Sequence, residues 1–383
     1  MHVLQVTNTL HKGGTETHLL DLTTGLRDLG VTCEVAFLRS VVAGGSPDLR
    51  EAFEAAGIRT HYLACESPYD LRAPVRLRRL LAARNWDILH SHLPRSDAAA
   101  AVCRLLDSRQ TWIATLHHPY DSDDDAYAGR RWVRPMAPMW RLADGVIAVS
   151  ESLRQWGITR LGLSPARVRT IVHGIEVGAP GPSSMSPTAS VAPRLRYRIG
   201  AIGRYERRKG HDTLIRSMIT ILKHFPDAEL RLAGHDPWGY GAVLKRLIDD
   251  LGVQGQVRLV GYVSDKDTFF ADIDVFAFAS RSEGFGIVVL EAMAAGKAVV
   301  VSNIAPLNEI VQPDQSGLVA DSDDPDGFAA AIVGLFRDPA RLECFGREAQ
   351  RRVRTEFSRT RMVARTLDYY RAVLHHRRTN EAS

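Results

Sequence analysis

The 383-residue chain has few cysteines and no hydrophobic run long enough to cross a bilayer. Its four cysteines form no CxxC pair, which argues against a disulfide framework and indicates free thiols in a reducing compartment. The longest apolar stretch, residues 286–301, is interrupted by Glu291 and Lys297. The first ten residues are too short and too polar for a signal peptide. These absences predict a cytoplasmic protein.

The sequence also lacks a concentrated basic region of the kind that binds nucleic acid. The formal net charge is +5, and the excess of lysine and arginine falls in residues 341–383. A nucleic-acid-binding domain carries clustered basic residues along one face, and the body of this chain shows no such cluster. We therefore expect no nucleic-acid partner.

Two common phosphate-binding motifs are missing as well. Gly200 and Gly203 stand at the wrong spacing for a GxGxxG sequence, and no GxxxxGK[ST] sequence occurs. The first motif binds dinucleotides and the second binds nucleoside triphosphates. Their absence argues against a nicotinamide site and against a P-loop enzyme.

No pattern of metal ligands is present. Asp272 and Asp274 form a DxD sequence, but Asp274 begins an apolar run and is expected to orient a turn. Four histidines lie at the ends of two predicted strands: His90, His92, His117 and His118. No cysteine or acidic residue stands near them at a spacing typical of zinc. We predict a reaction without a metal cofactor.

What the sequence does contain is a regular alternation of apolar strands and amphipathic helices. The predicted strands are residues 2–8, 32–38, 87–92, 111–118, 144–150 and 167–174, then 197–204, 229–235, 257–262, 275–280, 298–303 and 317–320. Such alternation is typical of parallel sheets covered by helices on both faces. Residues 178–193 are rich in Gly, Pro, Ser and Ala and interrupt it, as a linker does.

The prediction is therefore an α/β protein with two Rossmann-like doubly wound domains facing each other across a cleft. Residues 1–177 are expected to form the first domain and residues 194–357 the second. Residues 358–383 have a helical period and are expected to cross back to the first domain. In open α/β sheets, ligands bind outside the carboxyl ends of the strands.

Two segments of the second half carry the strongest chemical signals. Residues 280–296 place Gly284 and Gly286 between a strand and a helix, where backbone N–H groups favour anionic ligands. Glu291 lies farther into that helix, where a carboxylate can accept hydrogen bonds from a ribose diol. Arg204 and Lys209 follow a strand, as paired cations that stabilise a departing diphosphate would. The adjacent Arg207 and Arg208 are expected to be surface residues.

In the first half, Gly13 and Gly14 follow the first strand, and Thr15 is expected to cap the next helix. His117, at another strand end, can donate a hydrogen bond to a sugar hydroxyl or act as an acid or base. For each of these features a plain turn or surface loop is the alternative interpretation.

In this order, the motifs resemble the family 4 retaining glycosyltransferases, which have the GT-B fold. The resemblance covers nearly the whole chain, through residues 13–18, 87–92, 115–118, 144–153, 203–210, 232–235, 257–263 and 280–303. It implies metal-independent transfer of a hexose-type sugar from a UDP- or GDP-sugar to a glycan, lipid-linked or small-molecule hydroxyl acceptor. Such reactions serve glycan, polysaccharide or glycolipid biosynthesis.

The resemblance also implies that residues 1–177 are the acceptor-side domain and residues 194–357 the nucleotide-sugar-binding domain. It further implies roles for matching residues. Arg204 and Lys209 would hold the donor diphosphate, and Glu291 would bind the ribose. Glu283 would contact hydroxyls of the donor sugar, and His117 would lie beside the sugar and its leaving oxygen. These four form the predicted catalytic set: His117, Glu283, Arg204 and Lys209. The other predicted donor-binding residues are Gly13, Gly14, Gly284, Phe285, Gly286 and Glu291.

Several alternatives stay open. His173 stands where family members often have asparagine. A nucleotide-sugar epimerase shares the architecture but should lack the paired motifs of residues 203–210 and 280–291. A non-catalytic sugar-nucleotide-binding protein would keep the donor site and transfer nothing.

Contact with the inner face of a membrane is a further expectation. Residues 74–86 place Arg76, Arg78, Arg79 and Arg84 near Leu77, Leu80 and Leu81, and residues 130–142 place Trp132 and Trp140 near arginines. Basic residues beside leucine and tryptophan suit an anionic interface. The alternative is two ordinary helices with arginines on their outer faces.

Overall fold

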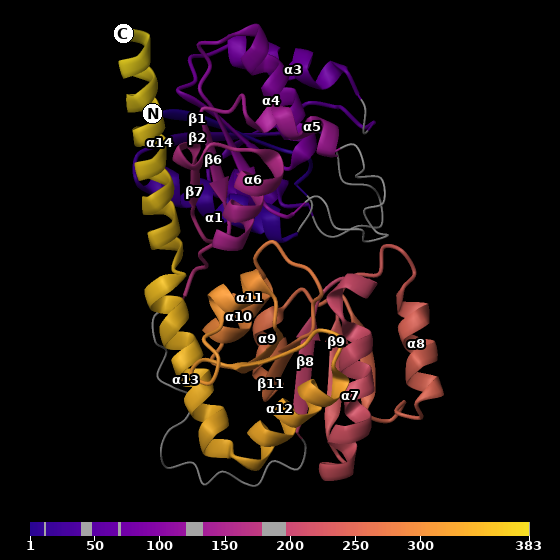
Figure 1. Cartoon of the computed structure of the whole chain (residues 1–383). Coiled ribbons are helices and arrows are strands. Elements are labelled where there is room, and N and C mark those ends of the chain that lie inside the picture. The colour runs from indigo at the N-terminus through magenta and orange to yellow at the C-terminus, as the bar shows by residue number, and fades with distance from the viewer. Residues whose placement is uncertain (11–12, 40–47, 68–69, 120–132, 178–196, 383) are drawn as a thin grey trace. The chain divides into compact units, whose positions relative to one another are not determined.

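The computed structural model of the chain (Figure 1) describes residues 1–10, 13–39, 48–67, 70–119, 133–177 and 197–382. It consists of two compact units, Met1–Ile175 with Arg359–Ser383, and Glu176–Ser358. The chain thus leaves the first unit after Ile175 and returns to it at Arg359. The predicted linker, residues 178–193, lies outside the described residues.

Within the described residues, the first unit has a 7-stranded sheet in the order β3-β2-β1-β4-β5-β6-β7. All neighbouring strands pair in parallel. The strands are β1 (His2–Thr7), β2 (Thr32–Phe37), β3 (Arg59–Tyr62), β4 (Ile88–His92), β5 (Trp112–Leu116), β6 (Gly145–Ala148) and β7 (Val168–Thr170). The sequence did not predict β3, because its polar residues carry no apolar signal.

The helices of this unit are α1 (Gly14–Asp28), α2 (Arg50–Ala55), α3 (Arg72–Ala82), α4 (Pro94–Leu106), α5 (Val133–Trp140), α6 (Glu151–Leu161) and α14 (Arg359–Ala382). Helix α1 begins at Gly14 with Gly13 as its N-cap, so the expected cap at Thr15 is wrong. Helix α14 packs closely on α1: a Cβ added at Gly25 would lie 2.5 Å from Val363.

The second unit has, in its described part, a 6-stranded parallel sheet in the order β10-β9-β8-β11-β12-β13. The strands are β8 (Arg198–Ile202), β9 (Glu229–Ala233), β10 (Val257–Gly261), β11 (Val275–Phe278), β12 (Ala298–Ser302) and β13 (Leu318–Ala320). The helices are α7 (His211–His224), α8 (Gly241–Asp250), α9 (Lys266–Ala271), α10 (Ile287–Ala294), α11 (Ala305–Ile310), α12 (Pro325–Arg337) and α13 (Pro339–Glu356).

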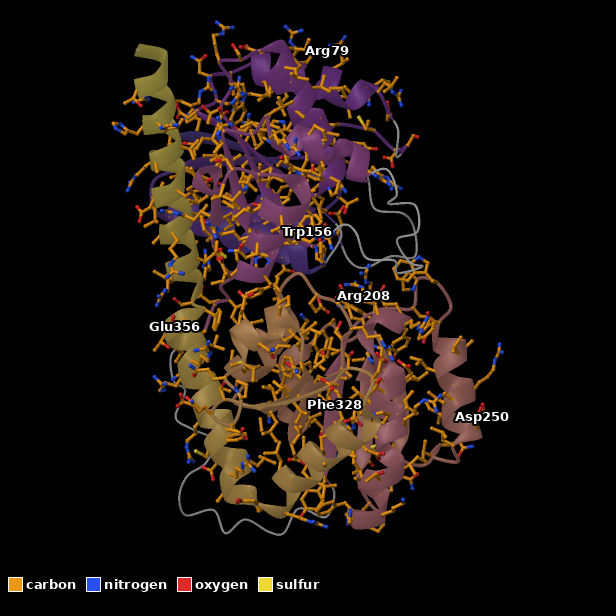
Figure 2. All side chains as sticks on the ribbon, in the orientation of Figure 1. Arg79, Trp156, Arg208, Asp250, Phe328 and Glu356 are labelled. Atoms are coloured by element: carbon orange, nitrogen blue, oxygen red, sulfur yellow. The ribbon has the colours of Figure 1, made fainter. Side chains whose placement is uncertain are left out.

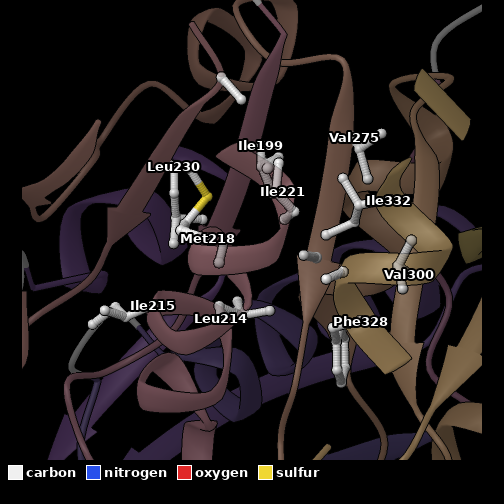
Figure 3. Packing of buried hydrophobic residues seen from close by; sticks show 14 of the residues in the cluster. Ile199, Leu214, Ile215, Met218, Ile221, Leu230, Val275, Val300, Phe328 and Ile332 are labelled. Carbon is white, nitrogen blue, oxygen red and sulfur yellow. The ribbon is translucent and has the colours of Figure 1, made fainter. Parts of the chain in front are cut away.

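The core of the second unit is packed between its sheet and two helices (Figure 3). Ile199 of β8 and Val300 of β12 meet Met218 of α7 and Phe328 of α12, and all four are buried. The position of Phe328 inside the unit can also be followed in Figure 2. This packing confirms the predicted α/β class, with helices laid against parallel sheets.

Both strand orders reverse direction at one point, between β1 and β4 in the first sheet and between β8 and β11 in the second. Open α/β sheets bind ligands at such switch points, beyond the carboxyl ends of the strands. The residues to inspect are therefore those that follow β1, β4, β8 and β11.

Candidate functional site

In the second unit, the loop after β8 is held in place by the residues after β9. Gly203 N donates to the Ala233 carbonyl at 2.9 Å, and Tyr205 N donates to the His235 carbonyl at 2.8 Å. A Cβ at Gly234 would lie 1.8 Å from the Gly203 carbonyl oxygen. Only glycine permits this approach of two backbones, which fixes where Arg204 leaves the sheet.

The Arg204 side chain stays partly exposed at this switch point. Its guanidinium lies 5.2 Å from the centroid of the Trp238 ring and 3.4 Å from Oε1 of Glu206. The planar guanidinium, with its fork of N–H donors, has a geometry that suits an anionic ligand such as a phosphate.

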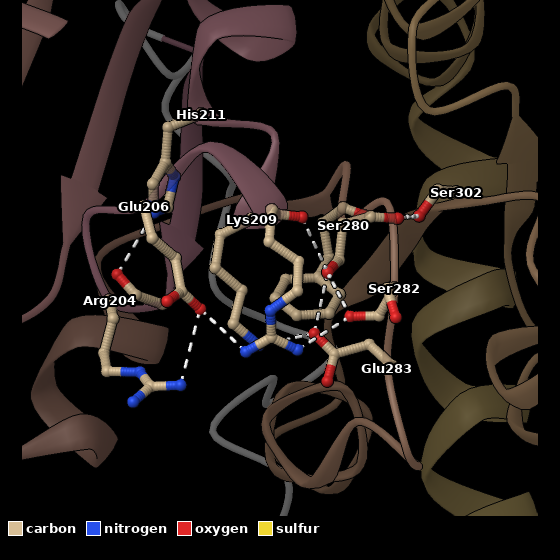
Figure 4. A network of polar contacts seen from close by, with 11 residues as sticks. Arg204, Glu206, Lys209, His211, Ser280, Ser282, Glu283 and Ser302 are labelled. Carbon is tan, nitrogen blue, oxygen red and sulfur yellow. Dashed lines mark hydrogen bonds and ion pairs between the residues drawn. The ribbon is translucent and has the colours of Figure 1, made fainter. Parts of the chain in front are cut away.

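Lys209 and Glu283 form a buried ion pair between the loops after β8 and β11 (Figure 4). Nζ of Lys209 lies 2.5 Å from Oε1 of Glu283, and the Ser280 hydroxyl donates to the same oxygen at 2.8 Å. Gly210 brings the loops together in the left-handed region at φ +66°, where a Cβ would lie 1.9 Å from the Ala279 carbonyl oxygen. The two motifs that the sequence singled out therefore meet.

The cations of this cluster keep Glu283 ionised. Burial alone would raise the pKa of Glu283, but the charges of Lys209 and Arg208 and the hydrogen bonds outweigh it, so the pKa lies below its usual value. Glu283 is thus a carboxylate.

Arg208 is not the surface residue that the sequence predicted. Its side chain is only 5% exposed, and it donates to the Ser282 carbonyl at 3.0 Å and to Oε1 of Glu206 at 2.7 Å. Arg207, the other residue of that prediction, is exposed. The short 3-10 turn Arg207–Lys209 directs Arg208 inward, where it braces the backbone just before Glu283.

The predicted ribose ligand, Glu291, has a partner that the sequence analysis missed. Both of its carboxylate oxygens contact Nζ of Lys266, the first residue of α9, at 2.6 and 2.7 Å. Gly286 caps α10 with φ +111°, and Phe285 before it is buried. A ribose diol at Glu291 would share the carboxylate with Lys266 or displace it.

In the first unit, buried histidines gather at the carboxyl ends of β4 and β5. His92 ends β4, His117 follows β5, His18 lies on α1 and His173 follows β7. The His117 ring stacks on His173 with centroids 5.6 Å apart, and the His18 ring lies 4.1 Å from His173. Burial lowers the pKa of His18 to about 3 and those of the other three well below the usual value, so the rings are neutral.

The predicted site residues thus fall into two groups. Arg204, Lys209, Glu283 and the 284–286 backbone lie at the switch point of the second unit, with Glu291 in the following helix. Gly13, Gly14 and His117 belong to the first unit. Among the described residues, no three His, Cys, Asp or Glu side chains are placed to hold a metal ion. The lack of a metal requirement remains a prediction.

Only some of the residues expected to face a membrane are exposed. Arg78 and Arg79 are exposed on α3, and Figure 2 shows Arg79 at the edge of the first unit. Leu77 is buried, and Arg76 donates to the backbone carbonyls of Leu63 and Ala64. Arg76 and Leu77 of the expected interface therefore have structural roles inside the first unit.

Trp140, which was expected at an interface formed by residues 130–142, is buried instead. It is only 1% exposed and donates to Asp97 at 3.0 Å. Trp132 lies outside the described residues. In the described part of the chain no helix has the length and apolar character to span a bilayer.

Two family models match the chain. The model described as Glycosyltransferase Family 4 matches residues 12–178, and the model described as Glycosyl transferases group 1 matches residues 190–352. Between them they cover most of both units, up to residue 352.

Curated relatives and solved structures agree with these models. The chain is 30% identical over 337 residues to a phosphatidyl-myo-inositol mannosyltransferase of Mycobacterium tuberculosis, covering 84% of this chain and 82% of the relative. It is 32% identical over 200 residues to a GDP-mannose-dependent alpha-(1-6)-phosphatidylinositol monomannoside mannosyltransferase of the same species, covering 48% and 51%. Anabaena HepE, solved in complex with UDP, is similar with a TM-score of 0.79 and 20% identity, over 97% of this chain and all of that one (100%). The last similarity supports the GT-B fold.

Proposed function

The chain belongs to family 4 of the glycosyltransferases, and from this premise we propose that it transfers a hexose from a GDP- or UDP-sugar to a hydroxyl acceptor with retention of configuration. Two mannosyltransferases among its relatives make GDP-mannose the first donor to test. Both names contain phosphatidylinositol, which makes phosphatidylinositol and its monomannoside the first acceptors to test.

The charge cluster at the switch point of the second unit carries this proposal. Arg204, Arg208 and Lys209 outnumber the two carboxylates that they contact, Glu206 and Glu283, so the cluster is positive. A nucleoside diphosphate carries charge of the opposite sign, and its negative charge grows as the bond to the sugar breaks. Preorganised cations stabilise that charge without a metal ion.

We propose retention because the chain resembles the retaining family 4 enzymes, and the way Glu283 is held favours a route without a protein nucleophile. A double-displacement mechanism needs a free carboxylate as nucleophile. Glu283 is occupied by Lys209 and Ser280, and Glu291 by Lys266. We therefore propose that the acceptor oxygen bonds to the anomeric carbon on the face from which the phosphate oxygen departs. The acceptor proton passes to that oxygen.

The decisive experiment is transfer with purified protein, a panel of GDP- and UDP-sugars and excess EDTA. The product configuration is read from the one-bond C–H coupling at the anomeric position. We expect a retained product at an undiminished rate. An inverted product, or activity abolished by EDTA and restored by magnesium or manganese, contradicts the proposal. Nucleotide binding with no transfer to any acceptor supports the non-catalytic alternative.

Variants of the cluster test the diphosphate assignment. Arg204→Ala and Lys209→Ala should each lower kcat/KM for the donor by roughly tenfold to a hundredfold, since each removes a charge-assisted hydrogen bond of about 1.5–3 kcal/mol. Arg207→Ala is the matched control, because Arg207 is an exposed cation of the same loop. Equal activity in all three variants would remove the assignment.

The pairing of Glu291 gives an independent test of ribose binding. Glu291→Gln should weaken binding of the free nucleoside diphosphate, whereas Lys266→Met should affect it much less. If only the Lys266 variant loses binding, Lys266 rather than Glu291 holds the nucleotide.

We also propose that α3 and α4 bring the first unit to an anionic membrane. The two helices pack on each other, and they expose Leu71 before α3 (87%) and Leu105 on α4 (67%) together with Arg78 and Arg79. Exposed leucines beside arginines suit a lipid interface. Arg78→Glu with Arg79→Glu should abolish salt-sensitive co-sedimentation with phosphatidylinositol vesicles. Unchanged co-sedimentation would exclude this surface.

A further inference from the structure

Helix α14 brings the hydroxyl of Tyr370 into the interior of the first unit. The hydroxyl of Tyr370, a wholly buried residue, lies 3.1 Å from Nε2 of Gln5 on β1 and 2.6 Å from Nδ1 of His90 on β4. A phenylalanine would fill the same volume without the cost of burying a hydroxyl. The hydroxyl therefore calls for an explanation beyond packing.

From Tyr370 a line of hydrogen bonds runs across the sheet to His117. The other end of the Gln5 amide, Oε1, lies 2.8 Å from Nε2 of His92, and Nδ1 of His92 lies 3.0 Å from Nε2 of His117. All four side chains are buried. Gln5 and His92, in the middle of the line, each form one hydrogen bond on either side, so the proton positions along the line depend on one another.

The donors and acceptors can be assigned one after another. Gln5 donates through Nε2 to the Tyr370 oxygen. Its Oε1 must then accept, so Nε2 of His92 carries a proton. A neutral His92 has one ring proton only, so its Nδ1 accepts, and Nε2 of His117 donates to it.

The contact between Tyr370 and His90 is consistent with these donor and acceptor assignments. The Tyr370 hydroxyl donates to Nδ1 of His90, so the proton of His90 is on Nε2, which lies 2.7 Å from the Thr115 hydroxyl. Burial lowers the pKa of His90 to about 3, which is consistent with a neutral ring that has one donor and one acceptor. No member of the line is then left with two facing donors or two facing acceptors.

We propose that Tyr370 is a positioning residue that fixes the tautomer of His117 through Gln5 and His92. His117 then carries its proton on Nε2 and keeps Nδ1 as an acceptor, which would take a hydrogen bond from a hydroxyl of the donor sugar or the acceptor. This role rests on the proposed sugar transfer and on the predicted position of His117 beside the donor sugar. The link is the amide of Gln5: the Tyr370 hydroxyl couples the orientation of this amide to the proton of His90. Without the hydroxyl, the amide can rotate independently of His90 and reverse every donor between Gln5 and His117.

The test compares Tyr370→Phe with Tyr369→Phe. Tyr369 is the neighbouring buried tyrosine of α14, and its hydroxyl bonds to the backbone of Val146 and Arg167 instead of to the histidines. Ring-nitrogen NMR spectra of 15N-histidine-labelled full-length protein report which nitrogen of His117 is protonated. A His117→Gln variant identifies the resonances.

We expect His117 to be protonated at Nε2 in the wild type and in Tyr369→Phe, and to show a mixture of tautomers in Tyr370→Phe. In the same comparison, kcat should fall about two- to tenfold in Tyr370→Phe, the equivalent of one neutral hydrogen bond, with nucleotide binding unchanged. Protonation at Nδ1 in the wild type, an unchanged tautomer in Tyr370→Phe, or the same change in both variants would overturn the inference. The NMR result stands even if the protein transfers no sugar, so failure of the proposed function is distinguishable.

Discussion

Replacing Asp97 with asparagine should change how the stability of the first unit depends on pH. Asp97 lies in the first turn of α4 and is wholly buried. Its carboxyl group accepts hydrogen bonds from the Ser91 hydroxyl at 2.6 Å and from the Trp140 indole at 3.0 Å. Burial raises the pKa of Asp97 to about 7, although the two hydrogen bonds oppose the change.

The sign and size of the effect follow from this pKa. The unfolded chain releases the proton near 3.8, whereas the folded chain holds it up to about 7. The stabilisation from the protonated carboxyl is therefore fully present below pH 4 and is lost as the pH rises to 7. Between pH 5 and pH 8, the free energy of unfolding should fall by roughly 2–3 kcal/mol because of Asp97 alone. Asparagine does not ionise, so the variant lacks this loss.

The assay is urea unfolding at pH 5, 6, 7 and 8, followed by tryptophan fluorescence. Trp140 bonds to Asp97 and Trp112 bonds to Ser91 at 2.8 Å, so two indoles report on this site. Asp368→Asn is the control, because Asp368 is an exposed aspartate of the same unit. If the wild type and Asp97→Asn lose stability in parallel from pH 5 to pH 8, the reasoning about the buried carboxyl is refuted.

Two further changes test other parts of the fold. Gly234→Ala should destabilise the second unit by about 1–3 kcal/mol, because the added Cβ would meet the Gly203 carbonyl oxygen at 1.8 Å. Gly255→Ala is the control and should leave stability unchanged, because a Cβ there has nothing within 4 Å. Equal melting temperatures of the two variants in a thermal scan would contradict the prediction for Gly234. Acidification should destabilise the first unit, because His18 and His90 have a pKa of about 3 when folded and an ordinary value of 6.5 when unfolded. Above pH 6.5 both rings are neutral in the folded and the unfolded chain, so their burial does not make stability depend on pH. Below pH 6.5 the free energy of unfolding falls, by roughly 3 kcal/mol at pH 5.5 for the two histidines together. Urea unfolding in the asparagine background described above removes the opposing effect of Asp97, and a flat profile from pH 7.5 to pH 5.5 would contradict the prediction.

Much of the fold could be predicted from the sequence because parallel strands are buried on both faces and read as continuous apolar runs. The strand Ala298–Ser302 is an example, since all of its residues are buried. Arg59–Tyr62 fails the same criterion because it lies at the edge of the sheet with half-exposed polar side chains.

The candidate site could be predicted less completely. The sequence located Lys209 and Glu283 because each follows a strand next to a glycine turn. It could not predict that Arg208 turns inward, because a run of three cations has no apolar period and the backbone of the turn decides the direction. Nor could it predict the contact of Tyr370 with Gln5, since 365 residues separate them and only the completed fold brings them together.

The return of the chain to the first unit at Arg359 has a consequence for how the protein folds while it is being synthesised. The backbone N–H of Arg359 donates to the carbonyl of Ile175 at 2.9 Å, so the whole second unit is an insertion between two parts of the first. The second unit is one continuous segment and can fold as soon as it leaves the ribosome. The first unit has its opening 175 residues ready long before but lacks α14, which covers α1 and supplies the Tyr370 hydroxyl. Until residue 382 is released, α1 exposes the apolar surface that α14 will cover, and the partly made first unit is the form most exposed to aggregation and proteolysis.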